Sequence, residues 1–145
     1  MTTERKNDLM EGVGRLWLLL KRYGRKKISE LDIGLTFDQM LVLFTLNNHE
    51  GLKIGDIAEM TDRDRTTTSR MISGLEKKNL VVRVPGRNDN RQRLIYLTRS
   101  AKDILNGLTP LREDFMKTLF KDLSRADIDK VAEMLNKVAD NLEGN

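Results

Sequence analysis

Hydrophobic residues recur every three or four positions over most of this chain, which is the spacing of amphipathic helices. The pattern predicts a long first helix over residues 8–31. Its apolar stripe is formed by Leu9, Val13, Leu16, Leu20 and Tyr23. Met10 and Trp17 lie beside that stripe and widen it, so we expect this helix to contact more than one neighbour. We expect the aromatic side chains of Trp17, Tyr23 and Phe44 to belong to a core rather than to a ligand cage.

A second helix is predicted to begin at a capping box, because Thr36 is followed three residues later by Gln39. Its apolar positions run from Phe37 to Leu46, and residues 47–51 are predicted to form a loop. A short helix is expected over residues 53–61.

The next helix, predicted over residues 65–79, has an unusually polar side. Asp64 is a good N-cap residue for it, and Asn79 suits a left-handed position at its C-terminal end. Its apolar side is supplied by Met71, Ile72 and Leu75, and its polar side by Thr66, Thr67, Ser69, Arg70 and Ser73. This polar side could be an ordinary solvated helix surface or a binding surface.

Two strand-like segments follow, residues 80–84 and 93–97, joined by a polar and basic hairpin loop over residues 85–92. Thr98 is predicted to cap a further helix, kinked at Thr109-Pro110 and continuing through Leu119. Ser124 and Asp127 form a weaker capping-box pattern. The last helix carries apolar residues at spacings of three and four, typical of a coiled-coil seam of about two heptads: Ile128, Val131, Leu135, Val138 and Leu142.

The positive charge is concentrated in one segment. The whole chain has a net charge of +4, but residues 62–99 hold ten Lys and Arg against four acids, a local net of +6. Residues 1–61 balance at nine against nine, and residues 100–145 have seven against nine. A basic segment that includes an exposed hairpin is typical of nucleic-acid binding, although charged runs are also common on solvated faces.

Composition excludes several other classes of function. A chain of 145 residues favours one domain, and the absence of cysteine excludes disulfides and thiolate metal sites. The longest apolar run near the start has five residues, Leu16–Leu20, far too few for a membrane span, so we expect a cytoplasmic protein. His49 is the one histidine, and Asp62 and Asp64 are interpreted as helix caps. We therefore expect no enzyme activity, no metal and no cofactor.

The order helix, turn, polar helix and two-stranded hairpin is that of a winged helix-turn-helix. An α-helix fits the major groove of B-DNA, and short polar side chains near its N-terminus reach base edges. An arginine on the hairpin tip can reach the adjacent minor groove. The alternative interpretation is a winged-helix module that binds a protein partner through the hairpin.

Residues 54–102 resemble the MarR/SlyA family of bacterial transcriptional regulators. The resemblance is carried by Ile57-Ala58, by Thr67–Arg70, by Leu75–Arg83, by Asp89-Asn90-Arg91 and by Leu97-Thr98. The sequence departs from the family pattern at Thr68, where valine is usual, at Asn79, where glycine is usual, and at Gly74, where a basic or polar residue is frequent.

The resemblance implies a mostly α homodimer with residues 1–35 and 100–145 as dimerisation helices and residues 36–99 as the winged DNA-binding region. It implies that Arg91 enters the minor groove and that Asp89 holds the wing in shape, by pairing with an arginine. The DNA-binding residues it suggests, together with their basic neighbours, are Arg65, Thr66, Thr67, Ser69, Arg70, Arg87, Asp89, Arg91 and Arg93. It also implies a pseudo-palindromic operator, a repressor role, and a small aromatic or phenolic effector bound between the dimerisation helices and the winged region.

Overall fold

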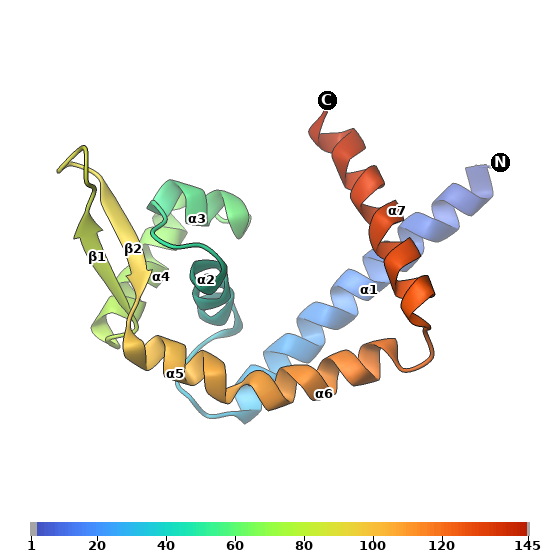
Figure 1. Cartoon of the computed structure of the whole chain (residues 1–145), viewed down its shortest axis with the longest axis horizontal. Coiled ribbons are helices and arrows are strands. Elements are labelled where there is room, and N and C mark those ends of the chain that lie inside the picture. Colours follow the sequence, from blue (N-terminus) through green and yellow to red (C-terminus); the bar gives the residue numbers. More distant parts are fainter. Residues whose placement is uncertain (1–2, 145) are drawn as a thin grey trace. The chain divides into compact units, whose positions relative to one another are not determined.

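The computed structural model describes residues 3–144, which form two compact units, one ending at Leu105 and the other beginning at Asn106. The first unit contains α1 (Thr3–Glu30), α2 (Phe37–Asn48), α3 (Ile54–Met60), α4 (Arg65–Lys77), β1 (Val81–Pro85) and β2 (Arg93–Leu97), and most of α5 (Arg99–Gly107). The second contains α6 (Thr109–Phe120) and α7 (Arg125–Glu143). This element order, traced in Figure 1, confirms the prediction of a mostly α fold with a winged helix-turn-helix.

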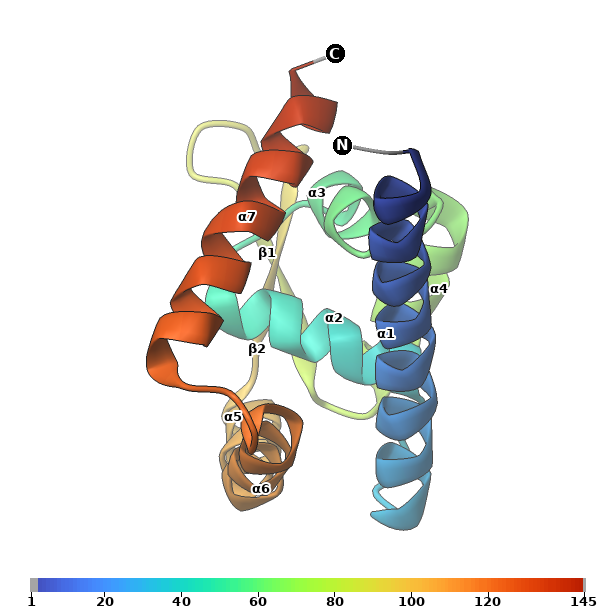
Figure 2. The ribbon, with the colours of Figure 1, turned by 90° about the vertical axis from the view of Figure 1, so that its right-hand side faces the viewer.

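The core of the first unit is built around α2, which contacts α1, α3 and β2, as the two perpendicular views show (Figures 1 and 2). Met40, Val42 and Leu43 of α2 are fully buried. Ile57 of α3, Ile72 and Leu75 of α4, and Ile95 of β2 are fully buried as well. Burying one such aliphatic side chain contributes about 1.5–3 kcal/mol, so these residues fix α3 and α4 relative to α2.

Capping residues begin the helices where the sequence predicts. The Thr36 hydroxyl accepts the Gln39 N–H at 3.1 Å while the Gln39 side chain accepts the Thr36 N–H at 3.0 Å, so this capping box is present. Ser124 and Asp127 form the same reciprocal arrangement at the start of α7. Asn79 has a left-handed backbone with φ of 58°, as predicted.

The wing is a two-stranded antiparallel sheet in which Val82 pairs with Tyr96 and Val84 with Leu94. Leu52 adds a one-residue bridge to the free edge of β2, exchanging two backbone hydrogen bonds with Ile95 at 2.8 and 3.3 Å. This bridge was absent from the sequence prediction, because a single pairing residue leaves no periodic signal. It ties the loop between α2 and α3 to the wing.

Several predicted boundaries were wrong. Helix α1 begins at Thr3 rather than residue 8, and α2 extends to Asn48, into the predicted loop. The predicted kink at Thr109-Pro110 is a break, since α5 ends at Gly107 and α6 begins at Thr109.

Trp17 is 63% exposed, so its predicted place in a core was wrong within this chain. Other apolar side chains of α1 are exposed with it, including Leu9, Leu16 and Leu19. The α7 seam is exposed too: Val131, Leu135 and Val138 each show between 44% and 50% of their surface.

Candidate nucleic-acid interface

The N-terminus of α4 is fixed by Asp64. Its carboxylate accepts the Thr67 backbone N–H and the Thr67 hydroxyl, both at 2.7 Å. The backbone bond, followed by the hydroxyl bond, lowers the pKa of the Asp64 carboxyl below its ordinary value. The cap therefore stays ionised at neutral pH and orders the first turn of α4.

The predicted contact residues of α4 mostly face solvent. Arg65, Thr66, Thr67 and Arg70 are exposed, whereas Ser69 is half-buried. Thr68 points into the core, and its hydroxyl donates to the Asp64 carbonyl oxygen at 2.9 Å. The Thr68 hydroxyl, which stands where a valine methyl group is usual in the family, is thus hydrogen-bonded to the N-cap residue of α4.

Two contacts that join distant segments hold α4 in its orientation, and neither was predicted. The Arg63 guanidinium, in the turn before α4, pairs with the Asp38 carboxylate of α2 at 2.9 Å. At the other end of α4, the Lys78 ammonium donates to the Gly34 carbonyl oxygen in the loop after α1. Arg63 therefore helps to position α4, and its ion pair and partial burial distinguish it from the exposed arginines.

The wing runs back along α4, so its tip lies toward the N-terminal end of that helix (Figure 1). Leu80 donates its N–H to the Leu75 carbonyl oxygen, and three residues later Arg83 donates to the Ser73 hydroxyl at 3.0 Å. Arg83 also pairs with Glu76 at 3.3 Å. Figure 1 shows that the start of α4, which carries the exposed hydroxyls, and the wing tip share one end of the first unit.

The wing tip is held by its own backbone. The Asp89 carboxylate accepts the Arg91 backbone N–H at 2.9 Å, and the Asp89 carbonyl oxygen accepts the Gln92 N–H at 3.1 Å. No ion pair between Asp89 and an arginine occurs among residues 3–144, so the expected pairing with an arginine side chain was wrong. The short side chain accepts a local N–H instead, as in an Asx turn.

Three arginines surround this turn. Arg87 and Arg91 are exposed with no side-chain partner among residues 3–144, whereas the Arg93 guanidinium donates to the Asn90 carbonyl oxygen at 2.6 Å. Arg93 therefore supports the tip, and Arg87 and Arg91 present their charge to solvent.

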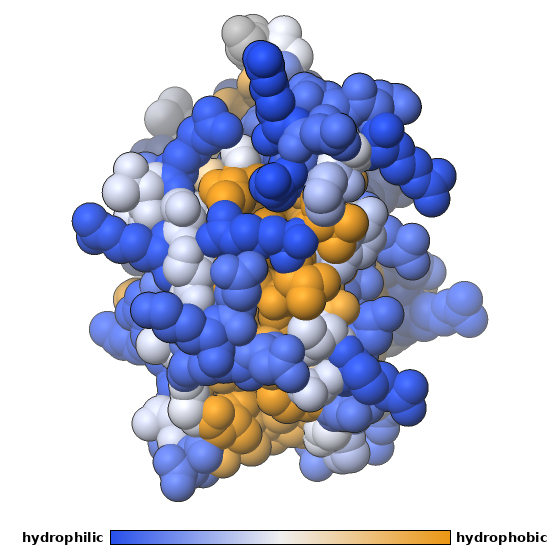
Figure 3. Space-filling model, turned by 90° about the vertical axis from the view of Figure 1, so that its left-hand side faces the viewer, coloured by the Kyte–Doolittle hydropathy of each residue, from blue (hydrophilic) through white to orange (hydrophobic). Residues whose placement is uncertain are grey.

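The outer face of the wing is apolar. Val82 and Val84 are 40% and 39% exposed, because alternate residues of β1 turn away from α4. Figure 3, which views the molecule from the side that carries β1, shows hydrophobic surface framed by hydrophilic side chains.

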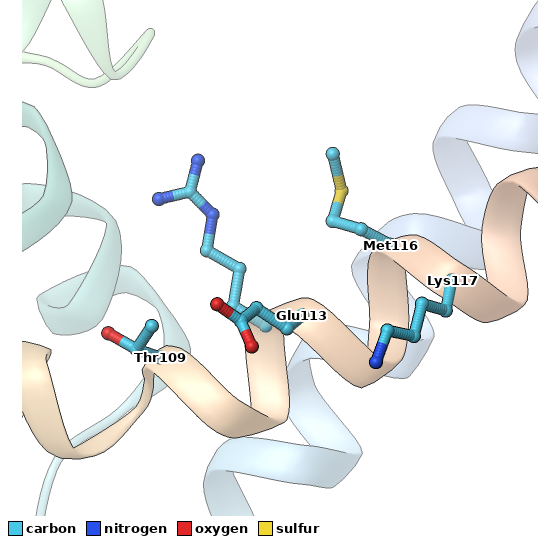
Figure 4. A pocket seen from close by; sticks show the side chains of 5 residues that line it. Thr109, Glu113, Met116 and Lys117 are labelled. Carbon is cyan, nitrogen blue, oxygen red and sulfur yellow. The ribbon is translucent and has the colours of Figure 1, made fainter. Parts of the chain in front are cut away.

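A shallow hollow on α6 offers no comparable site. Its lining comes from one helix, with Thr109, Glu113, Met116 and Lys117 labelled in Figure 4 and Arg112 beside them. Across residues 3–144, no three His, Cys, Asp or Glu side chains gather as metal ligands would, and no helix is long and apolar enough to cross a membrane.

The helix-turn-helix with its basic wing defines the chain as a winged-helix protein of the transcription-regulator class. Comparison with known proteins agrees: a MarR family profile matches residues 35–92. YfiV of Bacillus subtilis, an uncharacterized HTH-type transcriptional regulator, is 34% identical over 112 residues, which are 74% of this chain and 70% of that protein. SarZ of Staphylococcus aureus (strain USA300), an HTH-type transcriptional regulator, is 31% identical over 86% of this chain and 82% of its own length.

Among solved structures, the S. aureus MepR–DNA complex is similar with a TM-score of 0.75 and 26% identity, over 90% of this chain and 93% of MepR. The chain belongs to the MarR family. Members of this family are transcriptional regulators and not enzymes, in agreement with the prediction from composition.

Proposed function

We propose that this regulator binds a pseudo-palindromic DNA operator as a homodimer and represses transcription. Two copies of α4 would enter successive major grooves, about 34 Å apart, with Arg91 in the flanking minor groove. Arg65, Thr66, Thr67, Ser69 and Arg70 would contact bases and phosphates, with Arg87 and Arg93 adding phosphate contacts. Asp89 would hold the wing tip in shape.

The observation that carries this proposal is the clustering of exposed groups at one end of the first unit. The start of α4 presents hydroxyls and guanidinium groups, and the wing tip adds Arg87 and Arg91 at the same end. Most of these side chains are exposed, and neither Arg87 nor Arg91 has a carboxylate partner in the described chain, so little desolvation or ion-pair breakage opposes phosphate binding. The similarity to MepR, solved with DNA, supports the same conclusion.

Dimerisation through residues 1–35 and 100–145 is supported by the exposed apolar side chains of α1 and α7. A contiguous apolar seam such as that of α7 is costly in water and is a common protein interface. A two-fold dimer would also match a two-fold operator.

Two finer points rest on the family resemblance. A small aromatic or phenolic effector could release DNA only by favouring a dimer whose half-site spacing mismatches the duplex. A regulator of transcription must reach the chromosome, so we also infer a cytoplasmic location.

A protein-binding module is the second candidate, and the apolar outer face of β1, with Val82 and Val84, favours it. Selection of genomic fragments bound by the full chain, followed by titration over a range of salt, separates the two. DNA binding through phosphates predicts a linear fall of log affinity with log salt. Failure to enrich any fragment would refute the operator proposal.

Repression is tested by placing a reporter gene behind the selected fragment. We expect lower reporter expression with the regulator present. Higher expression would assign it an activating role instead.

A further inference from the structure

One arginine of the wing faces inward and joins the wing to α4. Arg83, in the middle of β1, has a side chain that is only 27% exposed, whereas Arg87 and Arg91 of the tip are exposed. Its guanidinium donates to the Ser73 hydroxyl at 3.0 Å, and its Nε lies 3.3 Å from a carboxylate oxygen of Glu76. Both partners lie on α4, so Arg83 connects the two elements.

Ser73 places this connection on a particular side of α4. Residues three or four apart in a helix lie on one side, so Ser73 continues the row formed by Ser69 and Arg70. Both of those residues belong to the proposed operator contacts. The sequence places Ser73 on the polar side with them, but in the structure it is half-buried and engaged by Arg83. The wing is therefore attached to the row of α4 that would contact the operator.

A second anchor holds the wing at the same level. Arg83 is paired in register with Ile95 of β2, and Ile95 exchanges backbone hydrogen bonds with Leu52 at 2.8 and 3.3 Å. This bridge holds β2 to the loop between α2 and α3, while Arg83 holds β1 to α4. Among residues 3–144, no hydrogen bond or ion pair joins the segment 84–94 to α4. The position of the tip relative to α4 therefore depends on these two anchors.

The length of the wing beyond the anchors makes their loss consequential. At about 3.3 Å per residue, residues 84–87 put the tip on the order of 10 Å beyond Arg83. A two-stranded sheet is only marginally stable by itself, so a wing that loses one anchor can rotate about the other. A rotation of about 20° moves the tip by about 3–4 Å, which is more than half the width of a minor groove of about 6 Å.

Stability and direct DNA contact account less well for this arginine. Ion pairs between partly exposed side chains contribute little to stability. The Arg83 guanidinium is turned toward α4, whereas the alternate residues Val82 and Val84 face outward. Its contacts with α4 compete with any contact to phosphate.

We propose that Arg83, held by Ser73 and Glu76, is a positioning residue that fixes the wing tip relative to α4. It would keep Arg91 at the height where the minor groove lies when α4 occupies the adjacent major groove. This inference rests on the proposed operator binding and names the contact that sets its geometry.

The first test measures the tip position in the free protein. The chain has no natural cysteine, so spin labels at Asn90→Cys and Thr66→Cys report the distance between the tip and the start of α4. Labelled chain is diluted with excess unlabelled chain to isolate the distance within one chain. We expect a broadened or shifted distance distribution in Ser73→Ala/Glu76→Ala and an unchanged one in Glu59→Ala, which removes an exposed acid of α3. Glu76→Ala alone gives the same comparison if the double variant folds poorly.

The second test uses the sign of the change in operator affinity. Ser73→Ala/Glu76→Ala removes an acid and frees the Arg83 cation, so charge alone predicts tighter binding to phosphates. A displaced tip predicts weaker binding, by at most the roughly 5- to 160-fold loss that corresponds to about 1–3 kcal/mol for Arg91→Ala. In an Arg91→Ala background the same change should cause no further loss. Glu76→Gln, which keeps an acceptor, and Glu59→Ala should bind at least as tightly as wild type.

These outcomes separate the proposal from the proposed function. A distance distribution in Ser73→Ala/Glu76→Ala equal to that of wild type would overturn the proposal. So would unchanged or tighter operator binding by this variant, or an equally large loss in the Arg91→Ala background. If wild type enriches no genomic fragment, the operator proposal fails, while the distances still decide whether Arg83 holds the wing.

Discussion

Two substitutions at Asp89 separate the two ways in which this residue could hold the wing. Family resemblance predicts a charge pair with an arginine, whereas the structure has the Asp89 carboxylate accepting the Arg91 backbone N–H at 2.9 Å. Asparagine keeps the acceptor and removes the charge, and alanine removes both. The structure therefore predicts that Asp89→Asn preserves operator binding and Asp89→Ala weakens it.

The magnitude follows from the bonds that order the tip. Asp89→Ala removes one of three backbone-donated bonds, leaving Gln92 N–H to the Asp89 carbonyl at 3.1 Å and Gly86 N–H to the Gln92 carbonyl at 3.0 Å. One such bond contributes about 0.5–1.5 kcal/mol, or about 2- to 13-fold in Kd. Asp89→Asn should bind within about twofold of wild type or more tightly, because it also removes a negative charge near phosphate.

Fluorescence anisotropy with a labelled operator at fixed salt measures both variants. Thermal melts should be unchanged, since Asp89 is exposed and remote from the core. If Asp89→Asn weakens binding as much as Asp89→Ala does, the charge and not the acceptor holds the wing, and the hydrogen-bond account is wrong.

Three further predictions concern other parts of the chain. Arg70→Ala and Thr67→Ala should change which bases a panel of operator variants prefers, and a uniform loss across the panel would assign both residues to phosphate contact. Leu135→Asp with Val138→Asp should convert a micromolar dimer to monomer or unfold it in sedimentation, whereas an unchanged dimer would exclude the α7 seam from the interface. The bonds from Thr67 lower the carboxyl pKa of Asp64, and the bonds from Ser124 lower that of Asp127, so both groups stabilise the fold above the ordinary carboxyl pKa and lose this contribution as the pH falls toward the lowered values. The double variant Asp64→Asn/Asp127→Asn should therefore show a smaller fall of Tm at acid pH than wild type. An identical fall in the two proteins would refute this linkage.

Local signals in the sequence were sufficient for much of the fold. Caps at Thr36, Asp64 and Ser124 are decided by residues three positions apart, so they could be predicted and are present. The same holds for the left-handed Asn79 and for the strands on either side of the wing tip.

Contacts between distant segments could not be predicted in this way. Arg63 and Asp38 are 25 residues apart, and only the packing of α2 against α3 brings them together. For Asp89, the sequence predicts that the residue holds the wing in shape, but it does not predict which group donates a hydrogen bond to the carboxylate. The prediction that Trp17 belongs to a core was wrong because an apolar stripe predicts that a helix face is buried, but not whether residues of the same chain bury it.

The central claim is that the exposed wing and α4 read a DNA operator, and Arg91→Ala tests it most directly. The measurement is an equilibrium titration of the selected operator at fixed salt, beside a thermal melt, with Arg112→Ala on α6 as an exposed arginine control. We expect Arg91→Ala to weaken binding by about 1–3 kcal/mol with an unchanged melt, and Arg112→Ala to bind as wild type does. Equal affinity of Arg91→Ala and wild type, with both proteins folded, would contradict the assignment of the wing to the minor groove.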